Sequence, residues 1–153
     1  MLARRRETLA VAESSAGGLI NAALVAVPGA SAFYLGGAII YTGASRSGFL
    51  GIGDKEMKGI RSATEPMARL LANRVREQTG ATWGLAETGA AGPTGNRYGD
   101  PAGHACIAVS GPVERAITVE TGRAEREDNM RAFTLRALEL LESCLSAAPP
   151  AAA

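Results

Sequence analysis

The chain has 153 residues, the length of a single domain with one hydrophobic core. Hydrophobic residues make up 46% of it and charged residues 20%, a balance that argues against a disordered chain. The formal net charge of +1 gives no electrostatic basis for binding nucleic acid or a membrane surface, so neither partner is expected.

Individual residues and segments argue against membrane-spanning, secreted and metal-binding proteins. No apolar run approaches the ~20 residues that span a bilayer. Met1–Ala3 leads directly into three arginines, which is not the pattern of a signal peptide, so we expect a cytoplasmic protein. The only histidine is His104, and Cys106 and Cys144 lie far apart. The sequence therefore predicts no metal site and no bound cofactor.

The chain begins with a strand followed by a helix. Thr8–Ala12 is apolar and short, which predicts a buried strand. Two glycines then lead into a helical pattern from about Ala16 to Val25. Proline and glycine within Val27–Ser31 end that helix, because both residues interrupt regular structure.

A second strand and a series of helices are expected next. Gly36–Thr42 predicts an apolar strand that ends in two hydroxyl side chains. A turn after Thr42 caps a short helix, and Asp54 is expected to be the N-cap of another. Thr64 opens a long helix that runs to about Gln78. Its apolar stripe predicts packing on the sheet.

The remaining elements are a strand, a hairpin and a final helix. Ala81–Ala86 predicts a third strand, and Gly103–Ser110 pairs with Val113–Glu120 around a Gly-Pro turn. Apolar residues recur at helical spacing over Arg126–Leu145. Strands that alternate with helices early and pair as a hairpin later predict an α/β fold, a three-layer α/β/α domain with a mixed sheet.

We expect this single domain to cover residues 1–146. The tail, residues 147–153, contains only alanine and proline. Terminal segments without anchoring side chains are usually frayed, so the tail is expected to be disordered.

Two corners rich in small residues are the candidate sites for chemistry. Leu9–Leu19 runs from a strand through a carboxylate and two serines into a helix, and Ala86–Gly95 has a similar composition. We expect the two corners to face one another across a pocket. Ser14 is placed like the nucleophile of an acyl-transfer enzyme, with backbone N–H groups nearby for an oxyanion. The alternative is that Ser14 or Ser15 caps the following helix, with Glu13 facing the positive helix end.

Other residues leave similar alternatives open. The glycines of the second corner let a ligand approach the backbone, although a surface loop has the same composition. Tyr41 and Thr42 are pocket hydroxyls or ordinary strand residues. Arg126 binds a phosphate or pairs with a neighbouring glutamate, and His104 is better explained as a structural histidine.

Several motifs together resemble the CinA C-terminal domain family, also called the competence/damage-inducible family. Ala12–Gly18 and Thr88–Gly95 resemble its paired signatures. Other segments also resemble the family, in the same order along the chain: Val27–Ser31 with Gly36–Gly37 and Tyr41–Thr42, Ser62–Pro66, and Pro101–Gly103. The resemblance covers about Thr8 to Leu145 and implies the CinA C-terminal fold.

Enzymatic members of that family are nicotinamide-nucleotide amidases. The resemblance therefore implies hydrolysis of the carboxamide of nicotinamide mononucleotide to nicotinic acid mononucleotide and ammonia, with a small-molecule nucleotide as partner. It also implies a homodimer. The expected catalytic residues are Ser14 as nucleophile, Tyr41, Thr88 and Arg46. The expected substrate-binding residues are Glu13, Gly17, Gly18, Thr42, Gly89, Ala91, Gly92 and Arg126.

Four residues in three segments depart from the family pattern. Arg46 stands where the amidases carry a lysine, and arginine stays protonated with a pKa above ~12, so it is a poor general base. Gly43 replaces a frequent asparagine, and Ser15–Ala16 replaces Cys-Thr. The amidase hypothesis then needs another base, such as Tyr41, His104 or a water held by a glutamate. The alternative hypothesis is a nucleotide-binding or regulatory protein without catalysis.

Overall fold

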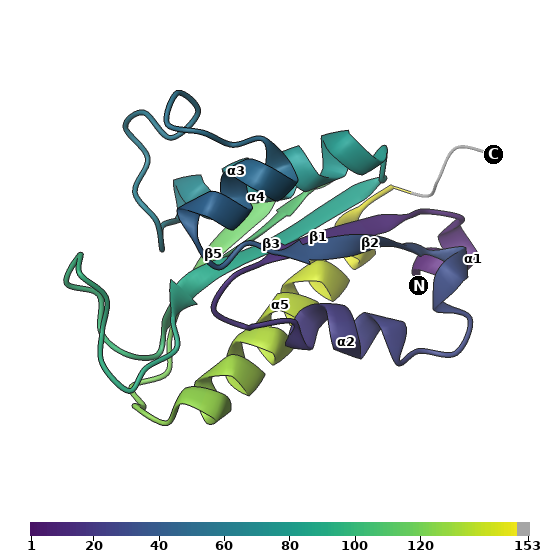
Figure 1. Cartoon of the computed structure of the whole chain (residues 1–153). Coiled ribbons are helices and arrows are strands. Elements are labelled where there is room, and N and C mark those ends of the chain that lie inside the picture. Colours follow the sequence, from purple (N-terminus) through teal and green to yellow (C-terminus); the bar gives the residue numbers. More distant parts are fainter. Residues whose placement is uncertain (150–153) are drawn as a thin grey trace.

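A mixed five-stranded sheet forms the centre of the computed structural model, which describes residues 1–149 (Figure 1). The elements are α1 (Leu2–Arg5), β1 (Leu9–Glu13), α2 (Leu19–Val25), the 3-10 helix η1 (Ala30–Ala32), β2 (Tyr34–Ile39), α3 (Gly43–Leu50), α4 (Glu65–Thr79), β3 (Trp83–Ala90), β4 (His104–Ser110), β5 (Arg115–Glu120) and α5 (Arg126–Ala147). The strand order is β2-β1-β3-β4-β5. β1 pairs in parallel with β2 and β3, whereas β3, β4 and β5 pair as antiparallel neighbours.

Helices cover both faces of this sheet. α2 and α5 pack on one face and α3 and α4 on the other (Figure 1). β1 is buried at all its positions, as expected for a central parallel strand that is covered on both sides. The prediction of a three-layer α/β/α domain with a mixed sheet is therefore confirmed.

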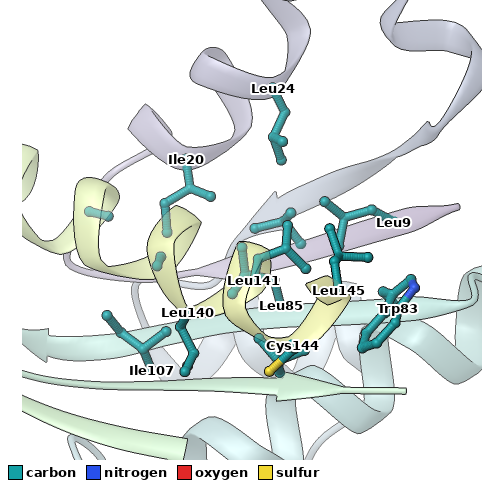
Figure 2. Packing of buried hydrophobic residues seen from close by; sticks show 14 of the residues in the cluster. Leu9, Ile20, Leu24, Trp83, Leu85, Ile107, Leu140, Leu141, Cys144 and Leu145 are labelled. Carbon is teal, nitrogen blue, oxygen red and sulfur yellow. The ribbon is translucent and has the colours of Figure 1, made fainter. Parts of the chain in front are cut away.

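One hydrophobic core lies between the sheet and the helices α2 and α5 (Figure 2). Trp83 and Phe133 are its largest side chains, and both are fully buried. The indole Nε1 of Trp83 donates to Glu7 Oε2 at 2.7 Å, so the polar atom of the largest core residue has a partner. Burial of each large side chain contributes about 1.5–3 kcal/mol, which fixes α5 along the sheet.

A second core lies on the opposite face, under α4. Met67, Leu71 and Val75 form the buried stripe of this helix. Thr64 caps it by accepting a hydrogen bond from the Met67 N–H, and Pro66 occupies the first turn, where a missing N–H is tolerated. The prediction that Thr64 opens a long helix is confirmed.

The boundaries of the first elements differ from those predicted. α2 begins at Leu19 rather than Ala16, because Gly17 and Gly18 have φ of 68° and 104° and form a turn before it. β2 starts at Tyr34 and ends at Ile39. Thr42 therefore lies outside the strand, where it caps α3.

The helix expected at Asp54 is absent. The segment 54–59 forms successive turns instead. The carboxylate of Glu56 accepts a hydrogen bond from the Gly53 N–H at 2.9 Å, which stabilises a single turn. The Ile60 N–H then donates to the Met57 carbonyl at 2.8 Å and closes the segment before a helix can extend.

The third strand is longer than predicted. Pairing between β1 and β3 ends at Ala12 and Ala86, but β3 continues to Ala90 because β4 still pairs with it on the other side. The first half of the expected second corner is therefore strand. This extension carries Thr88 and Gly89 beyond the end of β1.

The predicted disordered tail is partly wrong. α5 includes Ala147, and Ala148 is buried in the core beside α5. Arg5 Nη2 donates to the Pro149 carbonyl at 2.6 Å. Residues 150–153, the rest of the predicted tail, lie outside the described residues. Within the described part of the chain, no helix combines the length and apolar character needed to cross a membrane.

Candidate active site

A cavity opens where β1 ends and β3 continues. It has a volume of about 570 Å³, within the usual range of ~300–1,000 Å³ for small-molecule sites. A second cavity of about 230 Å³ adjoins it, because Tyr41 and Gly89 line both. The larger cavity is lined by Ser14, Ile40, Tyr41, Thr42, Gly43, Arg46, Ser62, Met67, Thr88, Gly89, Arg97 and Tyr98. The smaller is lined by Ser15, Tyr41, Gly89, Ala90, Ala91, Gly92, Thr94, Gly95, Asn96 and Arg126.

Both predicted corners contribute to these cavities. Ser14 comes from the first corner, and Thr88, Gly89, Ala91 and Gly92 from the second. The expectation that the corners face one another across a pocket is confirmed. The parallel pairing of β1 with β3 explains it, because parallel strands place their carboxyl ends at the same edge of a sheet.

Ser14 is the first residue after β1 and is half-buried at the cavity wall. Its backbone N–H donates to Glu87 Oε2 at 3.1 Å. Within the described part of the chain, its hydroxyl makes no hydrogen bond. The backbone of Ser14 is therefore anchored while its Oγ is left for a ligand.

Two fully buried glutamates support this corner from below. Glu13 Oε2 accepts from the Ile20 N–H at 2.9 Å and the Asn21 N–H at 3.3 Å, at the start of α2. Glu87 accepts from the N–H groups of Ser14 and Ala16 and from the Ser15 hydroxyl.

Burial changes the protonation of both carboxyl groups. It raises the pKa of Glu13 to about 7, and the neighbouring Glu87 adds to the increase. It also raises the pKa of Glu87, against the lowering effect of the hydrogen bonds that Glu87 accepts. Glu13, predicted to bind substrate, lines neither cavity and instead satisfies the first N–H groups of α2.

Gly17 and Gly18 also lie away from the cavity walls. A Cβ on Gly17 would be 2.8 Å from Cε of Met130, and one on Gly18 would be 3.1 Å from Cδ1 of Ile39. These glycines let the turn before α2 pack closely on α5 and β2. The structure thus places Glu13, Gly17 and Gly18 in the support of the corner rather than at a ligand.

Arg126 joins the two sides of the site. It is the first residue of α5, and its guanidinium donates to the Gly92 carbonyl and, at 2.9 Å, to the Tyr41 hydroxyl. Tyr41, 59% exposed, is thereby tied to the second corner. These contacts use one of the two N–H bonds on Nη1 and one of the two on Nη2.

Arg46 and Thr42 come from α3 and its cap. Thr42 Oγ1 accepts from the Ser45 N–H at 3.2 Å, so this hydroxyl caps the helix as well as lining the cavity. Arg46 Nε donates to the Ile52 carbonyl at 3.1 Å. That contact leaves its two terminal nitrogens for an anion.

Thr88 lies on the opposite wall and is buried. Its Oγ1 accepts from the Ala63 N–H at 3.2 Å, which links β3 to the segment before α4. Since this contact uses only a lone pair, the hydroxyl proton of Thr88 remains able to donate to a ligand.

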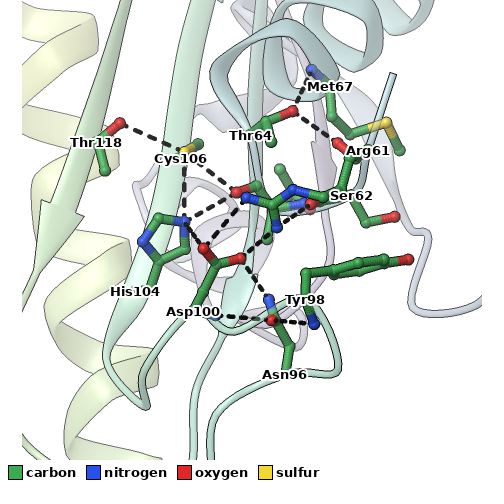
Figure 3. A network of polar contacts seen from close by, with 12 residues as sticks. Arg61, Ser62, Thr64, Met67, Asn96, Tyr98, Asp100, His104, Cys106 and Thr118 are labelled. Atoms are coloured by element: carbon green, nitrogen blue, oxygen red, sulfur yellow. Dashed lines mark hydrogen bonds and ion pairs between the residues drawn. The ribbon is translucent and has the colours of Figure 1, made fainter. Parts of the chain in front are cut away.

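Arg97 and Tyr98 also line the larger cavity, although neither was predicted from the sequence. Both lie in the loop that contains Asn96 and Asp100 (Figure 3). Asn96 Oδ1 accepts from the N–H groups of Tyr98 and Asp100 at 3.0 and 3.1 Å, which shapes the loop. Asp100 pairs with Arg61, and that pairing lowers the pKa of Asp100 to about 2. Residues 95–100 contain two glycines, an asparagine and an aspartate, the residue types that predict a turn.

His104 is a structural histidine. Its Nε2 lies 2.9 Å from the Ala63 carbonyl, and its Nδ1 bonds to Glu120. Burial lowers its pKa, but the bonds to Glu120 and Ala63 outweigh that effect and the net pKa is raised. Because both ring nitrogens are engaged and His104 lines neither cavity, it is not placed to act as a base there.

The charge of the site is positive. Arg46 and Arg97 line the larger cavity and Arg126 the smaller, and no aspartate or glutamate of the described chain lines either. Such a lining favours an anionic ligand such as a phosphate ester. The described residues contain no group of three or more His, Cys, Asp or Glu side chains placed to hold a metal ion.

Comparison with known proteins gives a consistent result. A family profile described as the CinA C-terminal domain matches residues 1–145. A CinA-like protein of Gloeobacter violaceus is 39% identical over 143 residues, which are 92% of this chain and 34% of that protein. The chain therefore spans about a third of the length of such curated relatives.

Solved structures with the same fold include two with similar sequences. A CinA superfamily protein from Escherichia coli has a TM-score of 0.85 and 25% identity, covering 92% of this chain and 82% of that one. A competence/damage-inducible protein from Agrobacterium tumefaciens has a TM-score of 0.84 and 26% identity, covering 94% of this chain and 88% of that one.

Proposed function

The chain belongs to the CinA C-terminal domain family, and from this membership we propose that it hydrolyses the carboxamide of nicotinamide mononucleotide. The products are nicotinic acid mononucleotide and ammonia. One observation carries the proposal: a single cavity is lined by the Ser14 hydroxyl, which makes no hydrogen bond within residues 1–149, by the hydroxyls of Tyr41 and Thr88, and by two arginines suited to a phosphate.

In this proposal Ser14 Oγ attacks the amide carbon and forms a tetrahedral intermediate. The C–N bond then breaks, ammonia leaves with the proton taken from Ser14, and an ester to Ser14 remains. Water cleaves that ester and releases the carboxylic acid. We assign the proton transfer to Tyr41, the cavity hydroxyl whose oxygen accepts a hydrogen bond from Arg126.

The oxyanion of the intermediate would be stabilised from the second corner. The N–H groups of Ser14 and Ala16 already donate to Glu87, so they are not available. The Trp83 N–H donates to the Thr8 carbonyl, on the side of β3 that faces β1. Every second N–H along a strand points to the same side, so the Gly89 N–H also points to that side. Pairing between β1 and β3 ends at Ala12 and Ala86, before Gly89 is reached. Gly89 lines both cavities, which makes its N–H the best placed donor.

A comparison of substrates tests the proposed phosphate recognition. Ammonia release is measured with nicotinamide mononucleotide and with nicotinamide riboside, which lacks the phosphate. We expect kcat/KM to be at least about 100-fold higher for the nucleotide, because a phosphate bound by two arginines contributes about 3 kcal/mol. Equal kcat/KM values would contradict this assignment of the arginines.

One observation favours a second candidate, a nucleotide-binding protein without catalysis. No lysine or histidine of the described chain lines either cavity, and Arg46 cannot release its proton to act as a base. This candidate predicts binding of nicotinamide mononucleotide in a calorimeter with no ammonia release over hours.

A further inference from the structure

Glu87 belongs to the interior of β3, yet its carboxylate serves the neighbouring corner. Oε2 accepts from the Ser14 N–H at 3.1 Å and from the Ala16 N–H at 2.9 Å, and Oε1 accepts from the Ser15 hydroxyl. These contacts fall where β1 has stopped pairing with β3, so the carboxylate replaces backbone acceptors that the sheet no longer supplies.

This arrangement is costly for the fold. Glu87 and Glu13 are both fully buried. The charge of Glu87 adds to the effect of burial in raising the pKa of Glu13. Burying a carboxylate beside another costs several kcal/mol unless its hydrogen bonds compensate for lost hydration. All three donors to Glu87 come from Ser14 and the two residues that follow it, so the compensation is concentrated at the nucleophile's own backbone.

We propose that Glu87 is a positioning residue that holds Ser14 at the cavity wall through the N–H groups of Ser14 and Ala16. It lines neither cavity, so it does not contact the ligand. The kcat measurements below rest on the proposed function. The backbone contacts of Glu87 can be tested without it, because they do not depend on catalysis.

Two conservative variants separate positioning from the other roles Glu87 could have. Glu87→Gln keeps the length and an oxygen for the two N–H groups, and the Ser15 hydroxyl can rotate to accept from the new amide. Glu87→Asp keeps the charge but withdraws the carboxylate by one methylene. A positioning residue therefore tolerates glutamine and fails with aspartate.

In steady-state assays with nicotinamide mononucleotide, we expect Glu87→Asp to lower kcat by about 10- to 100-fold, because a displacement near 1 Å costs that much. KM should change by less than about threefold, since the ligand contacts are intact. Glu87→Gln should keep kcat within about threefold. Loss of kcat in Glu87→Gln with retention in Glu87→Asp would overturn the proposal and indicate proton transfer by the carboxylate.

The matched control is Glu7→Gln. Glu7 is another buried glutamate, but it lies before the start of β1 and accepts from Trp83 Nε1. Its substitution should lower the melting temperature and leave kcat unchanged. If Glu87→Asp reduces kcat no more than Glu7→Gln does, Glu87 is only structural.

Hydrogen exchange gives a readout that does not depend on the proposed function. The Ser14 and Ala16 amides should exchange at least about tenfold faster in Glu87→Asp than in the wild type, and at the wild-type rate in Glu87→Gln. If the wild type has no amidase activity but shows this exchange pattern, the proposed function fails and the positioning role stands. Unchanged exchange in Glu87→Asp would overturn the positioning role.

Discussion

The guanidinium of Arg126 donates to the Tyr41 hydroxyl at 2.9 Å, across 85 positions of sequence. The same guanidinium donates to the Gly92 carbonyl, so one side chain joins the segment between β2 and α3, the second corner and the start of α5. Tyr41 lines both cavities. Arg126 therefore ties a residue that lines both cavities to the second corner.

Loss of this contact should impair catalysis in a coupled way. We expect Arg126→Met to lower kcat/KM for nicotinamide mononucleotide by about 10- to 100-fold, the value of a charged hydrogen bond. Tyr41→Phe should lower it by about 100- to 10,000-fold, because it also removes the hydroxyl to which proton transfer is assigned. The double variant should be little worse than the poorer single variant, because both changes remove one interaction. Fully additive losses in the double-mutant cycle would show that the two residues act separately.

Arg46 offers a test of anion binding and of proton transfer. Arg46→Met should raise KM for nicotinamide mononucleotide by about tenfold, because it removes a cation from the cavity. Arg46→Lys should restore KM, and its kcat should rise with pH as the lysine loses its proton. The measurement is a pH profile of kcat for the three proteins. A wild-type KM in Arg46→Met would contradict anion binding by Arg46.

The buried carboxyl of Glu13 makes stability depend on pH. Its folded pKa of about 7 lies above its ordinary value of 4.5, so the folded state retains the proton longer than the unfolded state. The resulting stability is complete below about pH 4.5 and is lost as the pH rises through about 7. The loss amounts to roughly 3 kcal/mol.

Glu13→Gln removes this titration. Urea unfolding at pH 5 and pH 8 should show that the wild type loses roughly 3 kcal/mol more than the variant between these values. Glu7→Gln is the control, because the pKa of Glu7 is lowered, chiefly by its hydrogen bond with Arg5. Parallel pH dependence in wild type and Glu13→Gln would rule out a raised pKa for Glu13.

Two glycines of positive φ differ in their surroundings. A Cβ on Gly92, which has φ of 110°, would lie 2.5 Å from the Ala124 carbonyl oxygen. Gly99 has φ of 93°, but a Cβ there would meet no atom within 4 Å. Gly92→Ala should cost about 2–4 kcal/mol in urea unfolding, and Gly99→Ala about 1 kcal/mol. Equal costs would show that backbone strain alone decides the effect.

Much of the fold could be predicted because local patterns and packing agree. The Thr64 cap, Pro66 and the apolar stripe of α4 all indicated one helix, and that helix is present. The prediction of a helix at Asp54 was wrong, because one good capping residue does not ensure a helix where a side chain such as that of Glu56 closes an isolated turn. The length of β3 depended on pairing with β4, a distant segment that no local pattern reveals.

The site residues that could be predicted are those whose side chains carry reactive or charged groups within a motif of the sequence. Ser14, Tyr41, Thr88 and Arg46 were expected and do line one cavity. The contact of Glu13 with the positive end of α2 was one of the alternatives expected from the sequence, but its complete burial was not, because the burial depends on how α2 turns back over β1. Likewise, the approach of Arg97 and Tyr98 to the cavity depends on the ion pair between Asp100 and Arg61, which lie 39 positions apart.

Ammonia release from nicotinamide mononucleotide by the wild type and by Ser14→Ala is the most direct test of the proposed chemistry. The assay uses purified protein without added metal, and a calorimeter confirms that both proteins bind the nucleotide. We predict turnover by the wild type and a loss of at least about 1,000-fold in kcat for Ser14→Ala, with binding retained. Equal turnover by both proteins would contradict a serine nucleophile, and binding without turnover in the wild type would contradict the amidase.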